Sequence, residues 1–199
     1  MFNRICIFVF YLTTMKYLIL SDIHGSEEAV QKALSYFESL KADRILILGD
    51  ILYHGPRNPI PSGYNPQGVV ALLNPLKDSI LAVRGNCEAE VDQMLLDFPC
   101  MGDFLIVQDG DNQLFVTHGH LYSPASLPSL PKGAAFLYGH THLWQATIQD
   151  GIILFNPGSI TLPKENRPAT FGIYEDGCLS VCRLDDGQVL SSVDMSELK

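Results

Sequence analysis

The chain has 199 residues, a formal net charge of −9 and a 47% share of hydrophobic residues. This composition indicates one globular domain with its own core, and it excludes disordered and collagen-like classes. With only 13 Lys and Arg residues, the chain lacks the clustered positive charge that extensive nucleic-acid binding requires. A small phosphate ester stays compatible with the acidic total, because bound cations would reverse the field locally.

Residues 1–14 contain one Arg and an apolar run at positions 5–12. The run is too short to span a bilayer and no small-residue cleavage site follows it, so we expect neither a transmembrane helix nor a signal peptide. We interpret residues 1–14 as an extension outside the native domain, and residues 15–199 as the domain. A targeting or membrane-surface segment and an extra ordered element are the alternatives.

The five cysteines are odd in number and include no Cys-x-x-Cys pair. This pattern favours a reducing, cytoplasmic location over a secreted disulfide scaffold. Cys178 and Cys182 would face the same side of a strand, where we expect small buried side chains rather than a bridge.

From residue 15 onward, short apolar runs alternate with Gly-containing polar segments and with helical periods. This alternation is typical of a layered α/β fold. The apolar runs are continuous and bounded by Gly or polar residues, as expected for buried strands. Strands are predicted at residues 17–20, 45–48, 80–83, 114–117, 134–138 and 152–155, with a further strand within 174–184.

Three helices are predicted between these strands. Ser26 can cap a helix that carries acidic residues in its first turn and an apolar stripe from 29 to 40. An Asn-Pro pair begins a second helix, from 66 to about 76, and a third spans 88–96. The Pro- and Gly-rich stretch 55–66 is a long loop, a type of segment that often carries function.

Side chains of metal-ligand type follow the predicted strands. The segments SDIHG, GD, RGN, THGH and GHTH come after the first five strands in that order. Because the carboxyl ends of strands in an open α/β sheet form one crevice, these side chains should converge. All six histidines lie in these loops: His24, His54, His118, His120, His140 and His142. Together with Asp22, Asp50 and Asn86 they offer mixed nitrogen and oxygen ligands, which favour a transition metal over Ca or Mg.

Each motif alone is more often a turn or a helix cap than a metal ligand. The ordered set resembles the calcineurin-like metallophosphoesterases from about Met15 onward and, within them, the small bacterial and archaeal phosphodiesterases. The segments that carry the resemblance are LSDIHGS, ILGDILYHGPRN, AVRGNCEAEVDQMLL, THGHLY, YGHTH and NPGS. The resemblance implies an α/β fold, a metallophosphoesterase-type β-sandwich flanked by helices in a four-layer αββα arrangement.

The resemblance also implies two divalent transition-metal ions, with Mn as the expected metal and Ni, Fe, Zn or Co as alternatives. One cation would be held by Asp22, His24 and His142, the other by Asn86, His118 and His140, with Asp50 bridging both. Two cations roughly 3.5 to 4 Å apart can share a water, lower its pKa and clamp a phosphate, so that a metal-bridging hydroxide attacks in line. The sequence contains no Gly-x-Ser-x-Gly elbow or P-loop that would suggest another nucleophile or phosphate cradle.

The chain departs from the family pattern at the expected general acid. Many relatives have a His directly after Gly-Asn, whereas this chain has Cys87, and it has Tyr53 and His54 where relatives have Asp and Arg. A neutral thiol with a pKa near 8.5 is a poor general acid at pH 7. His120 and, after it, His54 are the candidate replacements, each with a structural role in supporting a ligand or a surface loop as the alternative. Such a site should work best on esters with good leaving groups.

The long loop offers Arg57 and Asn58 as candidate substrate contacts, since Arg suits bidentate recognition of phosphate. A solvated loop or a subunit contact is the alternative. Asn156 and Ser159 belong to a family segment near the site, although the Pro-Gly pair between them is reason enough for a turn. Trp144 is expected to pack rather than to stack on a substrate.

We therefore expect a metal-dependent phosphodiesterase for small phosphodiesters, without membrane binding, and with a homo-oligomer suggested by the resemblance. Two alternatives stay open. A retromer subunit shares this fold but acts as a protein-binding scaffold, so the fold alone does not establish catalysis. A phosphomonoesterase would use the same centre. The complete set of ligands favours an enzyme over a scaffold.

Overall fold

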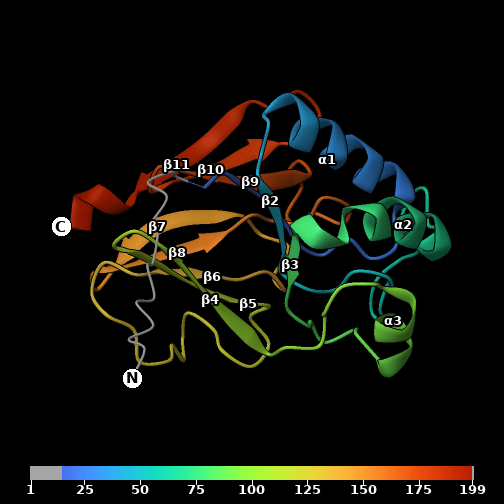
Figure 1. The fold of residues 1–199 in the computed structure, drawn as a ribbon, viewed down its shortest axis with the longest axis horizontal. Helices are drawn as coiled ribbons and strands as arrows, with labels where there is room; N and C mark the ends of the chain where they lie inside the picture. The colour runs from blue at the N-terminus through green and yellow to red at the C-terminus, as the bar shows by residue number, and fades with distance from the viewer. Residues whose placement is uncertain (1–14, 199) are drawn as a thin grey trace, which may run out of the picture.

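The computed structural model describes residues 15–198 (Figure 1). The interpretation of residues 1–14 as an extension falls outside this range. The strands are β1 (Tyr17–Leu20), β2 (Arg44–Ile47), β3 (Ile80–Ala82), β4 (Phe104–Asp109), β5 (Asn112–Thr117), β6 (Ala135–Leu137), β7 (Gln145–Gln149), β8 (Ile152–Asn156), β9 (Thr170–Glu175), β10 (Cys178–Arg183) and β11 (Val189–Asp194). The helices are α1 (Glu27–Ser39), α2 (Pro66–Leu73) and α3 (Glu90–Leu95), with the 3₁₀ helices η1 (Asn74–Ser79) and η2 (Met195–Leu198).

The strands form two sheets that pack face to face (Figure 1). One sheet has six strands in the order β11-β10-β9-β1-β2-β3, and the other has five in the order β4-β5-β6-β8-β7. In each sheet three neighbouring strands run parallel, β1, β2 and β3 in one and β5, β6 and β8 in the other, while the other neighbouring strands pair antiparallel. The parallel strands therefore bring their carboxyl ends to a common edge of each sheet.

Alternation along the strands divides the core into layers. Ile19 of β1 packs between the two sheets, whereas Leu18 and Leu20 pack on the opposite face with residues of α1 and α2. On the outer face of the five-stranded sheet, Phe115 and Phe136 are covered by apolar side chains of the loop 121–134. The predicted two-sheet α/β sandwich is confirmed. The layer outside the second sheet is formed by that loop, while the helices lie beside the first (Figure 1).

The helix boundaries agree with the sequence to different degrees. Ser26 Oγ accepts from the Ala29 N–H at 3.3 Å, which confirms the predicted cap of α1. The second helix ends at Leu73, earlier than predicted, because Pro75 cannot donate in an α-helical ladder, and the chain continues as η1. The third begins at Glu90 rather than at residue 88.

Within residues 15–198 no helix has the length and apolarity needed to cross a bilayer. Cys178 and Cys182 are free thiols, as expected; Cys182 belongs to the core beside the helices, but Cys178 is only half-buried.

Candidate metal centre

The loops after β1, β2 and β6 hold their polar residues in an unusual backbone conformation. Asp22, His24, Asp50, His140 and His142 all have positive φ, between 49° and 66°. Residues other than Gly rarely adopt this left-handed region, because it costs on the order of 1–3 kcal/mol at each position. Five strained residues in one place indicate a site whose side-chain directions are set by function.

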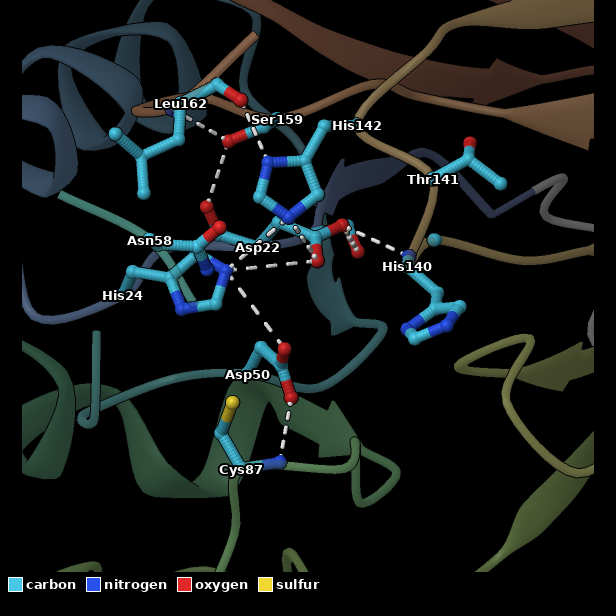
Figure 2. A network of polar contacts seen from close by, with 12 residues as sticks. Asp22, His24, Asp50, Asn58, Cys87, His140, Thr141, His142, Ser159 and Leu162 are labelled. Atoms are coloured by element: carbon cyan, nitrogen blue, oxygen red, sulfur yellow. Dashed lines mark hydrogen bonds and ion pairs between the residues drawn. The ribbon is translucent and has the colours of Figure 1, made fainter. Parts of the chain in front are cut away.

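Side chains from these three loops and from the loop after β5 converge. His142 Nε2 lies 3.3 Å from Asp22 Oδ1 and His24 Nε2 lies 3.8 Å from the same oxygen. Asp50 Oδ2 lies 3.7 Å from His24 Nε2 and 3.5 Å from His118 Nε2. All five side chains are buried, and Figure 2 shows His24 and His142 pointing toward the Asp22 carboxylate from two sides. The structure thus brings together these five of the residues that the sequence places at the strand ends.

Backbone carbonyls orient the three buried imidazoles. Nδ1 of His24 donates to the carbonyl oxygen of Tyr53 at 2.9 Å, Nδ1 of His142 to that of Leu162 at 2.6 Å, and Nδ1 of His118 to that of Leu48 at 2.6 Å. A carbonyl oxygen only accepts, so in each neutral ring the proton sits on Nδ1. Nε2 is left as an unprotonated lone pair directed into the cluster, which is the usual arrangement of a metal-binding His.

The cluster fits a cation. Asp22 Oδ1 and His118 Nε2 are buried without a hydrogen-bond partner. The Nε2 atoms of His24 and His142 are 3.3 Å apart, although both are acceptors when the rings are neutral. Buried acceptors that face one another are costly unless positive charge lies among them. The donor set therefore calls for a metal ion or, without one, a proton.

The pKa values of His118, His142 and Asp22 show the same demand for positive charge, whereas burial lowers the pKa of His24. Burial disfavours the imidazolium of His118, but the Asp50 and Asp22 carboxylates outweigh burial and raise its pKa to about 9. For His142, burial is likewise outweighed by Asp22, and the pKa is raised. Burial opposes ionisation of Asp22, yet His142 and His118 hold its pKa well below the usual range. A metal ion would take over the role of these protons.

Asn86 and His140 lie beside the cluster rather than within it. The His140 ring centroid is 5.2 Å from that of His118, and the His140 N–H donates to Asp22 Oδ2 at 3.0 Å (Figure 2). Asn86 is exposed, and its amide nitrogen donates to the Cys87 sulfur at 3.3 Å. Both residues line a cavity of about 400 Å³, together with Asp50, Arg57, Asn58, Thr141, His142 and Lys164. The cavity gives the buried cluster access to a ligand.

Glu88 is a structural part of the site that the sequence interpretation missed. Its carboxylate accepts from the backbone N–H of Asp50 at 2.9 Å, of Ile51 at 2.6 Å and of Gly85. Burial and the nearby Asp50 charge raise the pKa of Glu88 to about 7. The carboxylate joins the loop after β2 to the loop after β3 and so fixes Asp50 relative to Asn86. Its position directly after Gly-Asn-Cys, inside a segment that carries the resemblance, was the available signal.

The three candidate general acids, His120, Cys87 and His54, differ in their surroundings, and none of them lines the cavity. The half-buried His120 has its ring centroid 5.4 Å from that of His118, and its Nδ1 is buried without a partner. Cys87 approaches Asp50, whose Oδ1 accepts from the Cys87 N–H at 2.9 Å, and burial together with Asp50 raises the thiol pKa strongly. His54 instead packs edge-on against Tyr64. So high a pKa makes the Cys87 thiol a weak proton donor. Burial and the neighbouring His118 lower the pKa of His120, whose position beside His118 makes it the better placed candidate.

The NPGS segment, residues 156–159, donates hydrogen bonds to the backbone of two site loops. Ser159 Oγ donates to the carbonyl oxygen of Asp22 at 2.8 Å, and Asn156 Nδ2 donates to that of Gly139 at 2.9 Å. These bonds fix the loops after β1 and β6. Trp144 packs at the margin of the core between the sheets, as expected, with the Arg167 guanidinium 5.0 Å above its ring.

Comparison with known proteins places this geometry in a family. The family model described as "Calcineurin-like phosphoesterase superfamily domain" matches residues 15–176. Phosphodiesterase YfcE of Escherichia coli K12 is 45% identical over 179 residues, which cover 90% of this chain and 97% of that protein. Phosphodiesterase MJ0936 of Methanocaldococcus jannaschii is 26% identical over 152 residues, covering 72% of this chain and 83% of that protein.

Solved structures agree with the sequence matches. The structure of YfcE, a phosphoesterase from E. coli, superposes with a TM-score of 0.89 at 45% identity and covers 91% of this chain and all of that one. Vacuolar protein sorting 29 from Cryptosporidium parvum superposes with a TM-score of 0.60 at 19% identity, covering 91% of this chain and 98% of that one, and shares the fold alone. The family model and the 45% identical relative together establish that the chain belongs to the calcineurin-like phosphoesterase superfamily.

Proposed function

We propose that this protein is a metal-dependent phosphodiesterase that hydrolyses small phosphodiesters at a centre of two divalent transition-metal ions, with Mn as the working metal. In this proposal Asp22, His24 and His142 hold one ion, and Asn86, His118 and His140 hold the other. Asp50 bridges the two. The name of the relative YfcE, a phosphodiesterase with 45% identity, supports this activity.

The observation that carries the proposal is the position of Asp50. Its Oδ2 lies between His24 Nε2, at 3.7 Å, and His118 Nε2, at 3.5 Å, so one carboxylate oxygen faces a His from each proposed ligand set. Its other oxygen, Oδ1, accepts from the Cys87 N–H. The Glu88 carboxylate holds the Asp50 backbone. A carboxylate fixed in this way is suited to bridge two ions.

The residues of the chain bind and orient the substrate in this scheme. When bound, the two ions would supply an activated water and the positive charge that a phosphate needs in the transition state. The buried imidazoles, each fixed by a carbonyl, keep the centre rigid, which reduces reorganisation during the reaction. Asn58 and Thr141 line the cavity, where their side chains can contact the phosphate or its ester arm. His120, beside His118, is the proposed donor of a proton to the leaving oxygen.

Two other functions are compatible with the fold. Vacuolar protein sorting 29 shares the fold at 19% identity, and such a likeness carries no function. The buried acceptors of this chain, among them Asp22 Oδ1 and His118 Nε2, favour a metal site over a scaffold surface. A phosphomonoesterase would use the same centre, so the experiment below decides between a phosphodiester and a phosphomonoester as the substrate.

The test compares an aryl phosphodiester with the corresponding monoester, which share one leaving group, on metal-stripped protein. Mn, Ni, Zn or Mg is restored in turn, and bound metal is counted by elemental analysis. We expect two ions per chain and faster turnover of the diester. Asp50→Asn should abolish turnover, whereas the exposed Asp111→Asn should match the wild-type protein. Absence of metal-restorable turnover of either ester would support the scaffold instead.

A further inference from the structure

Two cationic side chains at the rim of the cavity have no counterion. Lys164 and Arg57 both line the cavity and are exposed. Neither takes part in an ion pair or a side-chain hydrogen bond within residues 15–198. Several other cations of the described chain are paired with carboxylates, as in Lys16–Glu175, Lys32–Asp185, Arg84–Asp103 and Arg183–Asp186, while Lys41 and Lys132 are unpaired within it but do not line this cavity. The positive charges of Lys164 and Arg57 at the rim are therefore available to an anionic ligand.

Lys164 is held at this rim by a strained turn. The Arg167 N–H donates to the Lys164 carbonyl at 3.1 Å, and the two residues between them, Glu165 and Asn166, have φ values of 56° and 55°. Positive φ at both central positions makes this a type I′ turn, for which Gly is the usual residue. A turn that keeps Glu165 in the left-handed region costs on the order of 1–3 kcal/mol, so the rest of the structure must enforce it.

Arg167 provides that enforcement. Its guanidinium lies 5.0 Å above the Trp144 ring, and its NH1 donates to the Trp144 carbonyl at 3.0 Å. At the other end of the turn, the Lys164 N–H donates to the His142 carbonyl at 3.4 Å. The turn is thus tied on one side to the loop that carries a proposed metal ligand. Lys164 is positioned next to the centre rather than left on a free loop.

The charge balance of the site identifies what Lys164 would bind. Two divalent cations held by two carboxylates, Asp22 and Asp50, and by neutral ligands leave the proposed centre with a positive surplus. A simple phosphodiester carries one negative charge, which this surplus already neutralises. Further cations at the rim are suited to a substrate that carries more negative charge than a simple phosphodiester.

We propose that Lys164, together with Arg57, binds a second anionic group of the substrate, a phosphate or a carboxylate on the ester arm beyond the scissile phosphate. The inference rests on the proposed function and narrows its substrate class from small phosphodiesters to those with an anionic arm. Lys164 supplies a point charge, and Arg57 a planar fork that pairs with two oxygens.

A matched pair of substrates tests the inference. Both are 4-nitrophenyl phosphodiesters with the same leaving group, one with an ethyl arm and one with a 2-carboxyethyl arm. In the Mn-loaded protein the carboxyethyl ester should have the lower KM. Lys164→Gln should raise KM for that ester roughly fivefold, the loss expected for one partly exposed ionic contact, and leave the ethyl ester unchanged. Lys164→Arg should retain most of the preference.

Lys132→Gln is the control, because Lys132 is also exposed and lines a different cavity, away from the centre. It should behave as the wild-type protein with both esters. Hydrolysis of both esters without any preference, unchanged in Lys164→Gln, would overturn the inference while leaving the proposed function intact. Failure to hydrolyse either ester would instead overturn the proposed function.

Binding without turnover gives a second readout. Trp144 is the single Trp of the chain and contacts the turn that carries Lys164, so its fluorescence should report a ligand there. In metal-stripped protein, pyrophosphate should change this fluorescence, and Lys164→Gln should weaken the apparent affinity several-fold, more so at low salt. An equal response in both proteins would show that pyrophosphate does not bind through Lys164 and would count against the inference.

Discussion

The Nε2 atoms of His24 and His142 lie 3.3 Å apart, although the two residues are 118 positions apart in the chain. Because each Nδ1 proton points to a carbonyl oxygen, the two lone pairs meet and need a cation between them. We predict that saturating Mn or Zn stabilises the folded protein. At 100 times Kd the gain is about 2.7 kcal/mol, which for a domain of this size raises Tm by about 5 to 10 °C.

Thermal unfolding of metal-stripped protein, with and without added metal, measures this gain. His142→Ala should lose most of the shift, because it removes one of the two facing nitrogens. His54→Ala should keep it, since the His54 ring packs against Tyr64 instead of joining the cluster. Equal shifts in both variants would show that metal binds elsewhere.

Proton release should accompany metal binding at neutral pH. The neighbouring carboxylates overcome the effect of burial and raise the pKa of His118 to about 9, from 6.5 in an unfolded chain, so the folded metal-free protein holds a proton there at pH 7. This proton stabilises the metal-free protein fully below pH 6.5, and the contribution is lost as the pH rises through 9. Apparent metal affinity should rise across the same window, because metal must displace the proton.

Calorimetry in two buffers of different ionisation enthalpy counts the released protons. We expect close to one proton from His118 at pH 7 and fewer as the pH approaches 9. A binding enthalpy independent of the buffer at pH 7 would contradict the protonated state of His118.

Sequence patterns identified the six parallel strands and β10, but not the antiparallel strands β4, β7, β9 and β11. β1 and β8 are buried along their length and read as continuous apolar runs. β7, with the sequence QATIQ, and β11, with VLSSVD, are half-exposed edge strands whose polar residues hide any apolar run. β4 was also missed, since two of its large apolar residues, Phe104 and Ile106, face outward. Edge strands form because a neighbour offers hydrogen bonds, a condition that local sequence does not contain.

Glu88→Gln should weaken both the fold and the metal site. The carboxylate accepts three backbone N–H bonds, with one oxygen shared by Asp50 and Gly85 and the other used by Ile51. A Gln amide has a single oxygen, so its NH₂ group must face at least one N–H. A buried unsatisfied donor costs about 1–3 kcal/mol. Chemical denaturation should show this loss, and metal titration a lower affinity. Glu90→Gln, at an exposed position on α3, is the control.

His120→Ala tests the source of the leaving-group proton. A positioned general acid contributes about 100-fold or more to turnover when the leaving group is poor, and little when it is 4-nitrophenolate. We therefore expect an alkyl ester to lose about 100-fold in kcat and an aryl ester to change less than threefold. His54→Ala should affect neither ester. If both esters lose activity equally in His120→Ala, His120 supports the ligand His118 instead of donating a proton.

The sequence predicted the proposed metal ligands of the site better than the residues that position them. Asp22, Asp50 and His118 follow buried strands, so topology alone brings them together. Glu88 and Lys164 gave no such signal, because an acidic residue near a helix start and a lysine in a polar loop are common for other reasons. Their roles arise from backbone groups of distant segments, at Asp50 and His142, which only the folded chain brings close.

Gly139 makes the approach of two site loops possible, and Gly139→Ala should therefore impair metal binding. A Cβ at this position would clash with Ser21 Oγ and lie 2.9 Å from Asp22 Oδ2. Ser21 Oγ donates to that same oxygen at 2.7 Å, so relief of the clash must disturb the hydrogen bond that orients the Asp22 carboxylate. Gly102→Ala is a matched control, because its Cβ meets nothing closer than 3.7 Å. Metal titration should show weaker binding for Gly139→Ala alone, and equal affinities in the two variants would mean that Asp22 is free to shift without loss.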